Sequence, residues 1–273
     1  MKKLSLSITC LATFAILSPA MSASSPWFKA DGAKIRLISL PSPDGRTIDA
    51  GLQIELEKGW KTYWRSPGAS GIPPEISFTG SQNIASTKLQ FPIPIAFGEG
   101  DNLTAGYKGS VTLPIAVEPL FSGRKVVLKV TGTLGICGEV CLPVEFTLSL
   151  TEDGKGFTSR DVSSALFNGS SNLIGKRRDD FHIESSHVVD TPLRTLAVSA
   201  RVPAGTVNST LHVEGPSDWY LTPVHAQKIE GNVAMFQIRL ADIPKDAKPH
   251  ATKLQFSLVA DGVGIEETLV PSK

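Results

Sequence analysis

Two cysteines, Cys137 and Cys141, lie between two stretches in which apolar residues alternate with others, 125–134 and 142–150. In an extended chain their Cα atoms would be about 13 Å apart, whereas bridged cysteines require about 4.4–6.8 Å. A bond between them therefore needs a turn, and Gly138 is suited to one. Alternation of period two is typical of strands. We expect a β-hairpin with the cysteines at the facing ends of its strands.

The N-terminus has the pattern of a secretory signal peptide over residues 1–23. Lys2 and Lys3 precede an apolar stretch, and small residues follow near Ala23. The apolar stretch is too short for a membrane span. Cleavage would remove Cys10 and leave the close pair as the only cysteines. Because disulfides persist outside the cytosol, we expect the pair to be oxidised at rest.

The spacing of the pair leaves its role open between a structural clip and a redox-active bond. Closing a loop of about five residues stabilises a fold by only about 2 kcal/mol. A mature chain of this length can bury enough apolar surface without such a clip. Strained or exposed bridges are the labile, catalytic kind.

Composition excludes several classes of function. Removing Lys2 and Lys3 from the 27 basic residues leaves 25 against 26 acidic residues, so no net field favours nucleic acid or anionic lipid. The mature sequence has no run of 18 apolar residues, no Gly-rich phosphate loop and no paired-histidine metal motif. We expect no cofactor and no metal. The histidines show no ligand spacing: His182, His187, His212, His225 and His250.

The remaining sequence is typical of an all-β protein. One short helix is expected within residues 159–166, inside a polar stretch, 151–172, that is the best domain boundary. It divides the mature chain into parts of residues 24–150 and 173–273, each the size of one β-sandwich. Gly, Pro, Asn and Asp clusters separate ten strand-like runs: residues 33–39, 48–57, 60–64, 110–117, 125–134, 142–150, 195–202, 209–214, 234–240 and 253–260.

Four ordered blocks resemble a known family: residues 59–74, 91–94, 106–111 and 137–143. They are similar to the periplasmic N-terminal domain of the DsbD and ScsB thiol–disulfide reductases. The three-residue spacer between the cysteines matches the ScsB-type pattern better. The C-terminal half is more weakly similar to the second sandwich of the ScsB type, most clearly at residues 215–219.

The resemblance implies two immunoglobulin-like β-sandwiches in tandem and a periplasmic thiol–disulfide oxidoreductase of the protein-disulfide-reductase type. Its disulfide would accept electrons from a membrane-embedded DsbD- or CcdA-like donor. It would pass them to periplasmic thioredoxin-fold or disulfide-isomerase acceptors, with cytochrome c biogenesis among the possible pathways. The sequence has no multi-span or thioredoxin-like region of its own, so the donor is expected to be a separate polypeptide, or else the chain has lost the relay. Only Cys137 and Cys141 map onto the family's redox pair.

Two features near the pair bear on its reactivity. Exchange requires that one sulfur be accessible, and we expect Cys141 to be the more reachable cysteine. Glu139 would disfavour a nearby thiolate and so raise its pKa, although it can equally be a polar turn residue.

Aromatic residues could shield the disulfide from stray thiols, as a cap segment does in this family. Tyr107, Phe97 and Trp64 are the cap candidates, and Tyr107 is favoured because glycines flank its segment. Trp60 and Tyr63 belong to the same set. Core packing is the alternative for Trp60 and Trp64, because alternate residues of a strand share a face.

Two classes of function therefore stay open. In the first, Cys137 and Cys141 relay reducing equivalents. In the second, the chain is a non-catalytic exported binding or assembly protein, and the same bond is only a loop clip. The response of the bond to thiol partners distinguishes the two.

Overall fold

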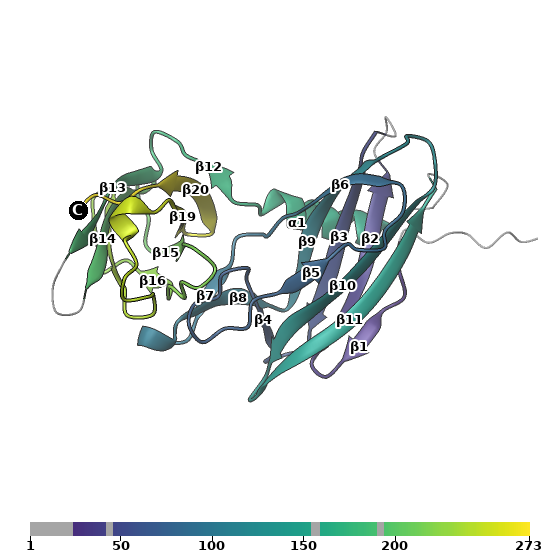
Figure 1. The fold of residues 1–273 in the computed structure, drawn as a ribbon, viewed down its shortest axis with the longest axis horizontal. Helices are drawn as coiled ribbons and strands as arrows, with labels where there is room; N and C mark the ends of the chain where they lie inside the picture. The colour runs from purple at the N-terminus through teal and green to yellow at the C-terminus, as the bar shows by residue number, and fades with distance from the viewer. Residues whose placement is uncertain (1–23, 42–45, 154–158, 190–193) are drawn as a thin grey trace, which may run out of the picture.

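The computed structural model describes residues 24–41, 46–153, 159–189 and 194–273. The expected signal peptide, residues 1–23, lies outside them. The described residues form four β-sheets arranged as two β-rich bodies at opposite ends of the molecule (Figure 1). The prediction of a mostly-β fold is confirmed.

The first body consists of two antiparallel sheets that pack face to face. One has the strand order β1-β2-β3-β9-β6 and the other β11-β10-β4-β8-β7, with β5 also pairing with β10. The strands of the first sheet are β1 (Phe28–Ala30), β2 (Ala33–Pro41), β3 (Ile48–Leu56), β6 (Ile84–Leu89) and β9 (Ser110–Pro119). Those of the second are β4 (Lys61–Tyr63), β5 (Glu75–Ser77), β7 (Ile95–Phe97), β8 (Thr104–Lys108), β10 (Val126–Cys137) and β11 (Cys141–Glu152). A 3-10 turn, Gly100–Asn102, joins β7 to β8.

The second body is built from two further sheets, with strand orders β12-β20-β19-β15-β16 and β13-β14-β18-β17. The strands of its first sheet are β12 (Gly175–Lys176), β15 (Ser209–Glu214), β16 (Val224–His225), β19 (Leu254–Ala260) and β20 (Val263–Leu269). Those of its second are β13 (His182–Val189), β14 (Thr195–Arg201), β17 (Lys228–Glu230) and β18 (Val233–Arg239). A second 3-10 turn, Pro249–Ala251, precedes β19.

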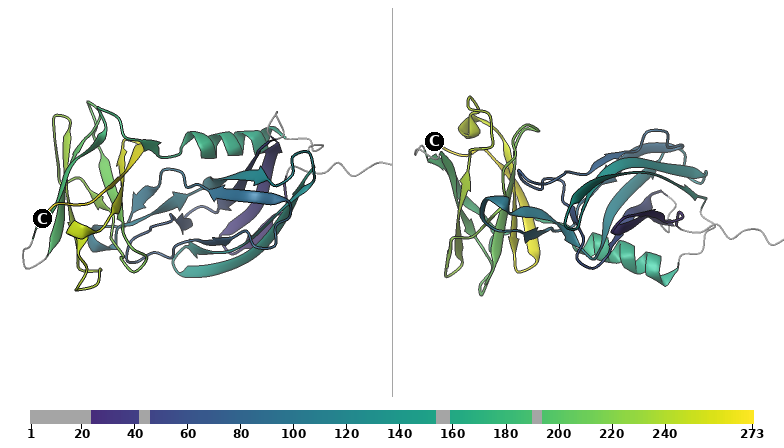
Figure 2. Two further views of the ribbon diagram at one scale, coloured as in Figure 1. Left: turned by 45° about the horizontal axis from the view of Figure 1, so that its top comes forward. Right: turned by 90° about the horizontal axis from the view of Figure 1, so that it is seen from below.

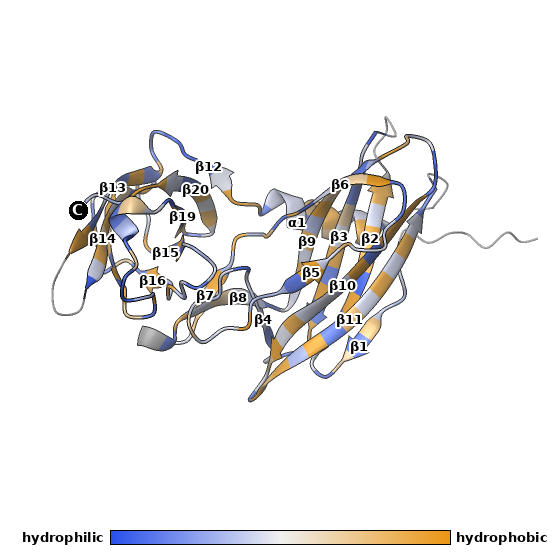
Figure 3. Cartoon of the chain, viewed as in Figure 1, coloured by the Kyte–Doolittle hydropathy of each residue, from blue (hydrophilic) through white to orange (hydrophobic). Residues whose placement is uncertain are grey.

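Each body has its own apolar core. Apolar residues alternate along β10 and β11 (Figure 3), and the inward-facing ones are buried between the two sheets of the first body. A separate cluster that includes Phe181, Phe236 and Phe256 fills the second body. Alternation of period two places one set of side chains of each strand inside, so the same pattern that predicts the strands also fixes their buried faces.

The α-helix α1 (Arg160–Ser171), the one helix of this type in the described segments, confirms the helix expected within residues 159–166 and extends beyond it. It lies along the outside of the first body (Figure 2) and contacts β2, β3 and β9. Val162 and Leu166 pack on Ile38 of β2. Gly169 permits the close approach, because a Cβ there would lie 2.7 Å from the Thr112 carbonyl oxygen of β9.

Candidate functional site

The disulfide closes the end of the β10–β11 hairpin. The two strands pair in register from Val126 with Glu152 to Cys137 with Cys141, and a bond joins these two cysteines. Both the hairpin and the disulfide expected from the sequence are therefore present. The bond lies where the β10–β11 ladder ends and the turn begins, and Cys137 is also paired with Lys61 of β4 on its other side.

The two cysteines differ in their exposure to solvent. Cys137 is fully buried, whereas Cys141 is exposed, in line with the expectation that Cys141 is the more reachable. Two large apolar residues beside Cys141 are also exposed, Val140 at 68% and Leu142 at 38%. The tip of the hairpin therefore presents one cysteine on an apolar, solvent-facing surface, and Glu139 lies exposed on the same turn.

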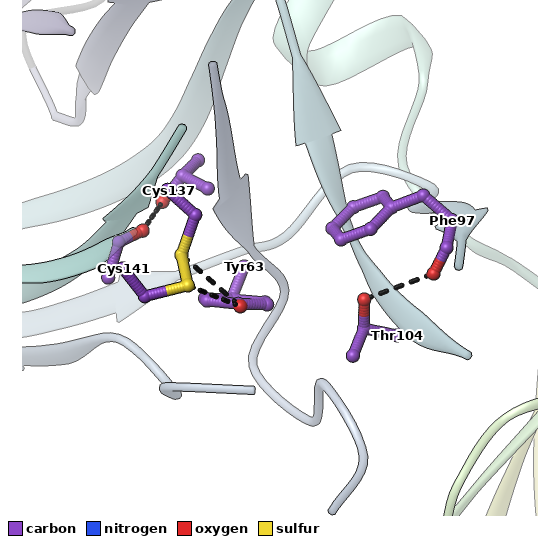
Figure 4. The surroundings of a disulfide bond; sticks show 7 residues. Tyr63, Phe97, Thr104, Cys137 and Cys141 are labelled. Carbon is purple, nitrogen blue, oxygen red and sulfur yellow. Dashed lines mark hydrogen bonds between the residues drawn. A yellow bond between two sulfur atoms is a disulfide. The ribbon is translucent and has the colours of Figure 1, made fainter. Parts of the chain in front are cut away.

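Tyr63 of β4 contacts both sulfurs of the bond through its hydroxyl. Its hydroxyl oxygen lies 3.2 Å from the Sγ of Cys137 and 3.2 Å from the Sγ of Cys141 (Figure 4). A disulfide sulfur carries no hydrogen, so the Tyr63 O–H is the donor to both. Burial raises the pKa of Tyr63, so the hydroxyl keeps its proton at neutral pH. After reduction, the same O–H would donate to a thiolate, which is a stronger acceptor than a disulfide sulfur.

Two glycines make room for the aromatic rings on this face of the sheet. A Cβ at Gly135 of β10 would lie 2.8 Å from the Tyr63 ring, and one at Gly106 of β8 would lie 3.0 Å from the Phe97 ring. The strand pairing places Tyr63 opposite Gly106, and the Tyr63 and Phe97 ring centroids are 6.2 Å apart. Bulkier residues at these positions would push the rings off the sheet and Tyr63 away from the sulfurs.

Trp60 packs against the turn of the hairpin. Its ring lies between two glycines, and a Cβ would fall 3.2 Å from the ring at Gly138 and 2.0 Å from it at Gly32. Gly138 is not among the glycines with a positive φ angle in the described residues, whereas Gly32 is. Gly138 lies in the turn that follows Cys137, as expected from the sequence, and its lack of a side chain also leaves room for the Trp60 ring.

The cap candidates fall into two groups. Phe97 packs in a small cluster with Tyr63, Ile72 and Cys137, next to the disulfide. Tyr107 and Trp64 belong to the main core of the first body, so neither covers the disulfide in this structure. Thr62, Tyr107 and Ile136 are paired across neighbouring strands and face the main core. Tyr63 and Cys137 lie on the opposite face of the same sheet, where they are buried in the smaller cluster with Phe97.

Tyr107 is also fixed by a hydrogen bond. Its hydroxyl donates to the Pro92 carbonyl oxygen at 2.8 Å, and burial raises its pKa well above the usual value. Lys61 and Lys108 lie over the ring of Phe97, the cap candidate beside the disulfide, with their Nζ atoms 4.5 Å and 5.6 Å from the ring centroid. A cation near an aromatic face is attracted to it, so these lysines help to hold Phe97 in place.

The described residues bring together no group of three or more His, Cys, Asp and Glu side chains that could hold a metal ion. None of the helices in the described segments has the length and apolar character that a bilayer span requires. The chemistry of the site therefore rests on the two sulfurs and the hydroxyl of Tyr63.

Fold and site together define a class: a β protein of two bodies with a disulfide at the end of a hairpin. The two cysteines are four residues apart, and one of them is buried while the other is exposed. Residues 33–153 match the family described as Thiol:disulfide interchange protein DsbD, N-terminal. This segment contains the whole hairpin and every residue that packs around the bond. The first body thus matches the DsbD N-terminal domain family, and the match ends where the first body ends.

A solved structure resembles both bodies. The crystal structure of the N-terminal periplasmic domain of ScsB from Proteus mirabilis matches with a TM-score of 0.71, covering 92% of this chain and 99% of that chain. The sequence identity is 20%, so the likeness shows the fold. No curated protein sequence matches the chain.

Proposed function

We propose that this protein is a periplasmic thiol–disulfide exchange module that relays reducing equivalents through Cys137 and Cys141. The observation that carries the proposal is the asymmetry of the bond, with one sulfur on a buried cysteine and the other on an exposed cysteine in an apolar tip. An exchange protein needs one sulfur that a partner can reach and a second that resolves the mixed disulfide. A pure clip has no need of this arrangement.

The relay begins when a thiolate of a reduced donor protein attacks the Sγ of Cys141. The Cys137–Cys141 bond breaks, and Cys137 leaves as a thiolate to which the Tyr63 O–H donates. The second thiolate of the donor then attacks the donor sulfur of the mixed disulfide and releases Cys141. The donor has lost two electrons and become a disulfide, and this chain, after taking up two protons, holds two thiols. The reverse sequence, with the disulfide of an acceptor, passes the two electrons on.

The family match supports the finer parts of this proposal. It favours an immunoglobulin-like sandwich over residues 24–150, a linker over 151–172 and a second sandwich over 173–273. The likeness to a periplasmic domain supports export by a signal peptide and a periplasmic location. We infer that the donor is a membrane-embedded DsbD- or CcdA-like protein and that the acceptors are thioredoxin-fold or disulfide-isomerase proteins of that compartment.

Trapping of mixed disulfides tests the relay directly. Cys137→Ser leaves the exposed Cys141 without its resolving partner, so it should accumulate mixed disulfides in the periplasm. Cys141→Ser leaves only the buried Cys137 and should trap about tenfold less, because exchange depends on access. Non-reducing electrophoresis followed by mass spectrometry measures both, with the double variant Cys137→Ser/Cys141→Ser as the matched control. If neither single variant traps a partner, the bond is a loop clip and the relay is wrong.

The reduction potential of the purified protein provides a second, independent measurement. Equilibration in glutathione or dithiothreitol buffers and counting of free thiols should give about −200 to −250 mV, the range of exchange catalysts. A value below about −300 mV is typical of structural bonds and would contradict the proposal.

A further inference from the structure

The loop of residues 64–72 begins and ends at the disulfide. Tyr63, immediately before it, donates to both sulfurs, and Ile72, its last residue, packs in the cluster with Tyr63 and Cys137. A Cβ at Gly135, on the strand that carries Cys137, would lie 2.7 Å from the Cβ of Ile72 and 2.8 Å from the Tyr63 ring. Both ends of the loop therefore cover the same face of the disulfide.

The middle of this loop is attached to the second body. Arg65 donates through Nε and Nη2 to the carboxylate of Glu214 on β15, with its shortest contact 2.7 Å, and through Nη2 also to Glu266 on β20. The three side chains are 20–29% exposed, so water screens these pairs only in part. Planar, bidentate pairing of this kind fixes the direction of the guanidinium as well as its position.

The residues on either side of Arg65 reinforce the attachment. Trp64 is fully buried, and its ring centroid lies 5.2 Å from that of His212 in an edge-on arrangement. Gly68 approaches the second body so closely that a Cβ there would lie 2.9 Å from Pro223. Ala105 of β8 links the loop to its own sheet, because it exchanges backbone hydrogen bonds with Trp64 and Pro67.

The face of the second body that contacts this loop carries polar side chains. His212, Ser257 and Glu266 are directly paired across β15, β19 and β20, so they share one face of the sheet. Ser257 donates to Glu266 at 3.1 Å and lies 3.5 Å from Arg65, and both His212 and Ser257 are buried. Buried polar groups are costly unless they are paired, and Arg65 pairs with Ser257 and Glu266, so this part of the face is suited to a guanidinium.

We propose that the second body sets the reactivity of the disulfide by holding the loop 64–72 in place, with Arg65 as the positioning residue. The clasp of Arg65 with Glu214 and Glu266 fixes the strand end that carries Tyr63 and keeps Tyr63 and Ile72 over the sulfurs. This deepens the proposed function and rests on it. It assigns the second body a role in controlling how readily thiols reach the bond.

The test is the rate at which dithiothreitol reduces the disulfide of the full chain. A dithiothreitol thiolate attacks Cys141, Cys137 leaves, and the second dithiothreitol sulfur closes a ring and frees Cys141, so the reagent is oxidised and the protein gains two thiols. Glu214→Gln/Glu266→Gln removes both charges that hold Arg65 while it keeps the shapes. The second-order rate constant should rise about tenfold, because the loop then leaves the sulfurs more often.

The control changes the same number of charges in the same body. Glu184→Gln/Glu230→Gln breaks the pairs with Arg201 and Lys228 in the other sheet, and its rate constant should stay within twofold of the parent. Arg65→Lys keeps the charge without the fork and should give an intermediate rate, whereas Arg65→Met should match the double Gln variant. Circular dichroism confirms that each variant is folded.

Two outcomes would overturn the clasp. One is a parental rate in folded Glu214→Gln/Glu266→Gln, and the other is an equal acceleration in the control. The trapping experiment tests the relay independently of the clasp, since reduction by a small thiol needs no protein partner. A faster reduction without any trapped partner would keep the clasp and reject the relay.

Discussion

At the scale of single residues, the hydroxyl of Tyr63 is the group that most directly affects the sulfurs. Tyr63→Phe removes the hydroxyl that lies 3.2 Å from both Sγ atoms and leaves the ring in place. A hydrogen bond to a charged acceptor contributes about 1.5–3 kcal/mol. In the reduced protein, the more acidic cysteine should therefore show a pKa raised by about one to two units, measured by thiolate absorbance during a pH titration.

Tyr107→Phe is the matched control for this change. Tyr107 is a buried tyrosine of the same sheet, but its hydroxyl donates to Pro92 in the core and not to sulfur. Its loss should lower stability and leave the cysteine pKa values unchanged. An equal pKa shift in both variants would mean that Tyr63 acts through the fold rather than through the sulfurs.

At the scale of elements, the β10–β11 hairpin depends on the glycine that admits the Tyr63 ring. Gly135→Ala would place a Cβ 2.7 Å from Ile72 and 2.8 Å from Tyr63, inside van der Waals contact on both sides. Overpacking of this kind costs about 1–3 kcal/mol. We expect a corresponding fall in the free energy of unfolding in urea, together with faster reduction by dithiothreitol.

Gly175→Ala provides the comparison, because a Cβ there would meet only the Gly264 carbonyl oxygen at 3.4 Å and the φ angle is ordinary. Its stability should stay within about 0.5 kcal/mol of the parent. If Gly135→Ala is equally harmless, the rings can shift at no cost and the packing argument fails.

The same elements explain what sequence reasoning could and could not reach. The hairpin, its disulfide and the helix α1 follow from local patterns, since alternation and spacing depend on neighbours along the chain. Short strands such as β5 and β7 are three residues long and carry too little periodicity to be recognised. The choice between Phe97 and Tyr107 as cover depends on which face of the sheet each strand presents, and pairing register sets that face only in the folded protein.

The role of Arg65 has no local signal at all. Its partners, Glu214 and Glu266, lie 149 and 201 positions away along the chain, and an isolated Arg after an aromatic strand reads as an ordinary surface residue. Only the packing of the two bodies brings these charges together. Contacts of such sequence separation are the part of a site that a single sequence leaves undetermined.

At the scale of the whole molecule, the contact between the bodies makes stability depend on pH. His212 is fully enclosed beside Trp64, and neither of its ring nitrogens has a hydrogen-bond partner within the described part of the chain. Burial, followed by the positive charges of Arg65 and His225, lowers the pKa of His212 from 6.5 to about 3. The unfolded chain therefore binds a proton between these values that the folded protein does not.

The sign of the effect follows from this difference. The contribution of His212 to the free energy of unfolding is fully present above pH 6.5 and is lost as the pH drops towards 3. Between pH 7 and pH 5 this loss amounts to about 2 kcal/mol. His212→Phe keeps a ring against Trp64 and removes the titrating group, so this part of the pH dependence should disappear from urea unfolding curves. His225→Phe, at an exposed position on β16, should retain the parental slope. A parental slope in His212→Phe would instead assign the acid sensitivity to carboxylates elsewhere and leave the contact between the bodies insensitive to pH.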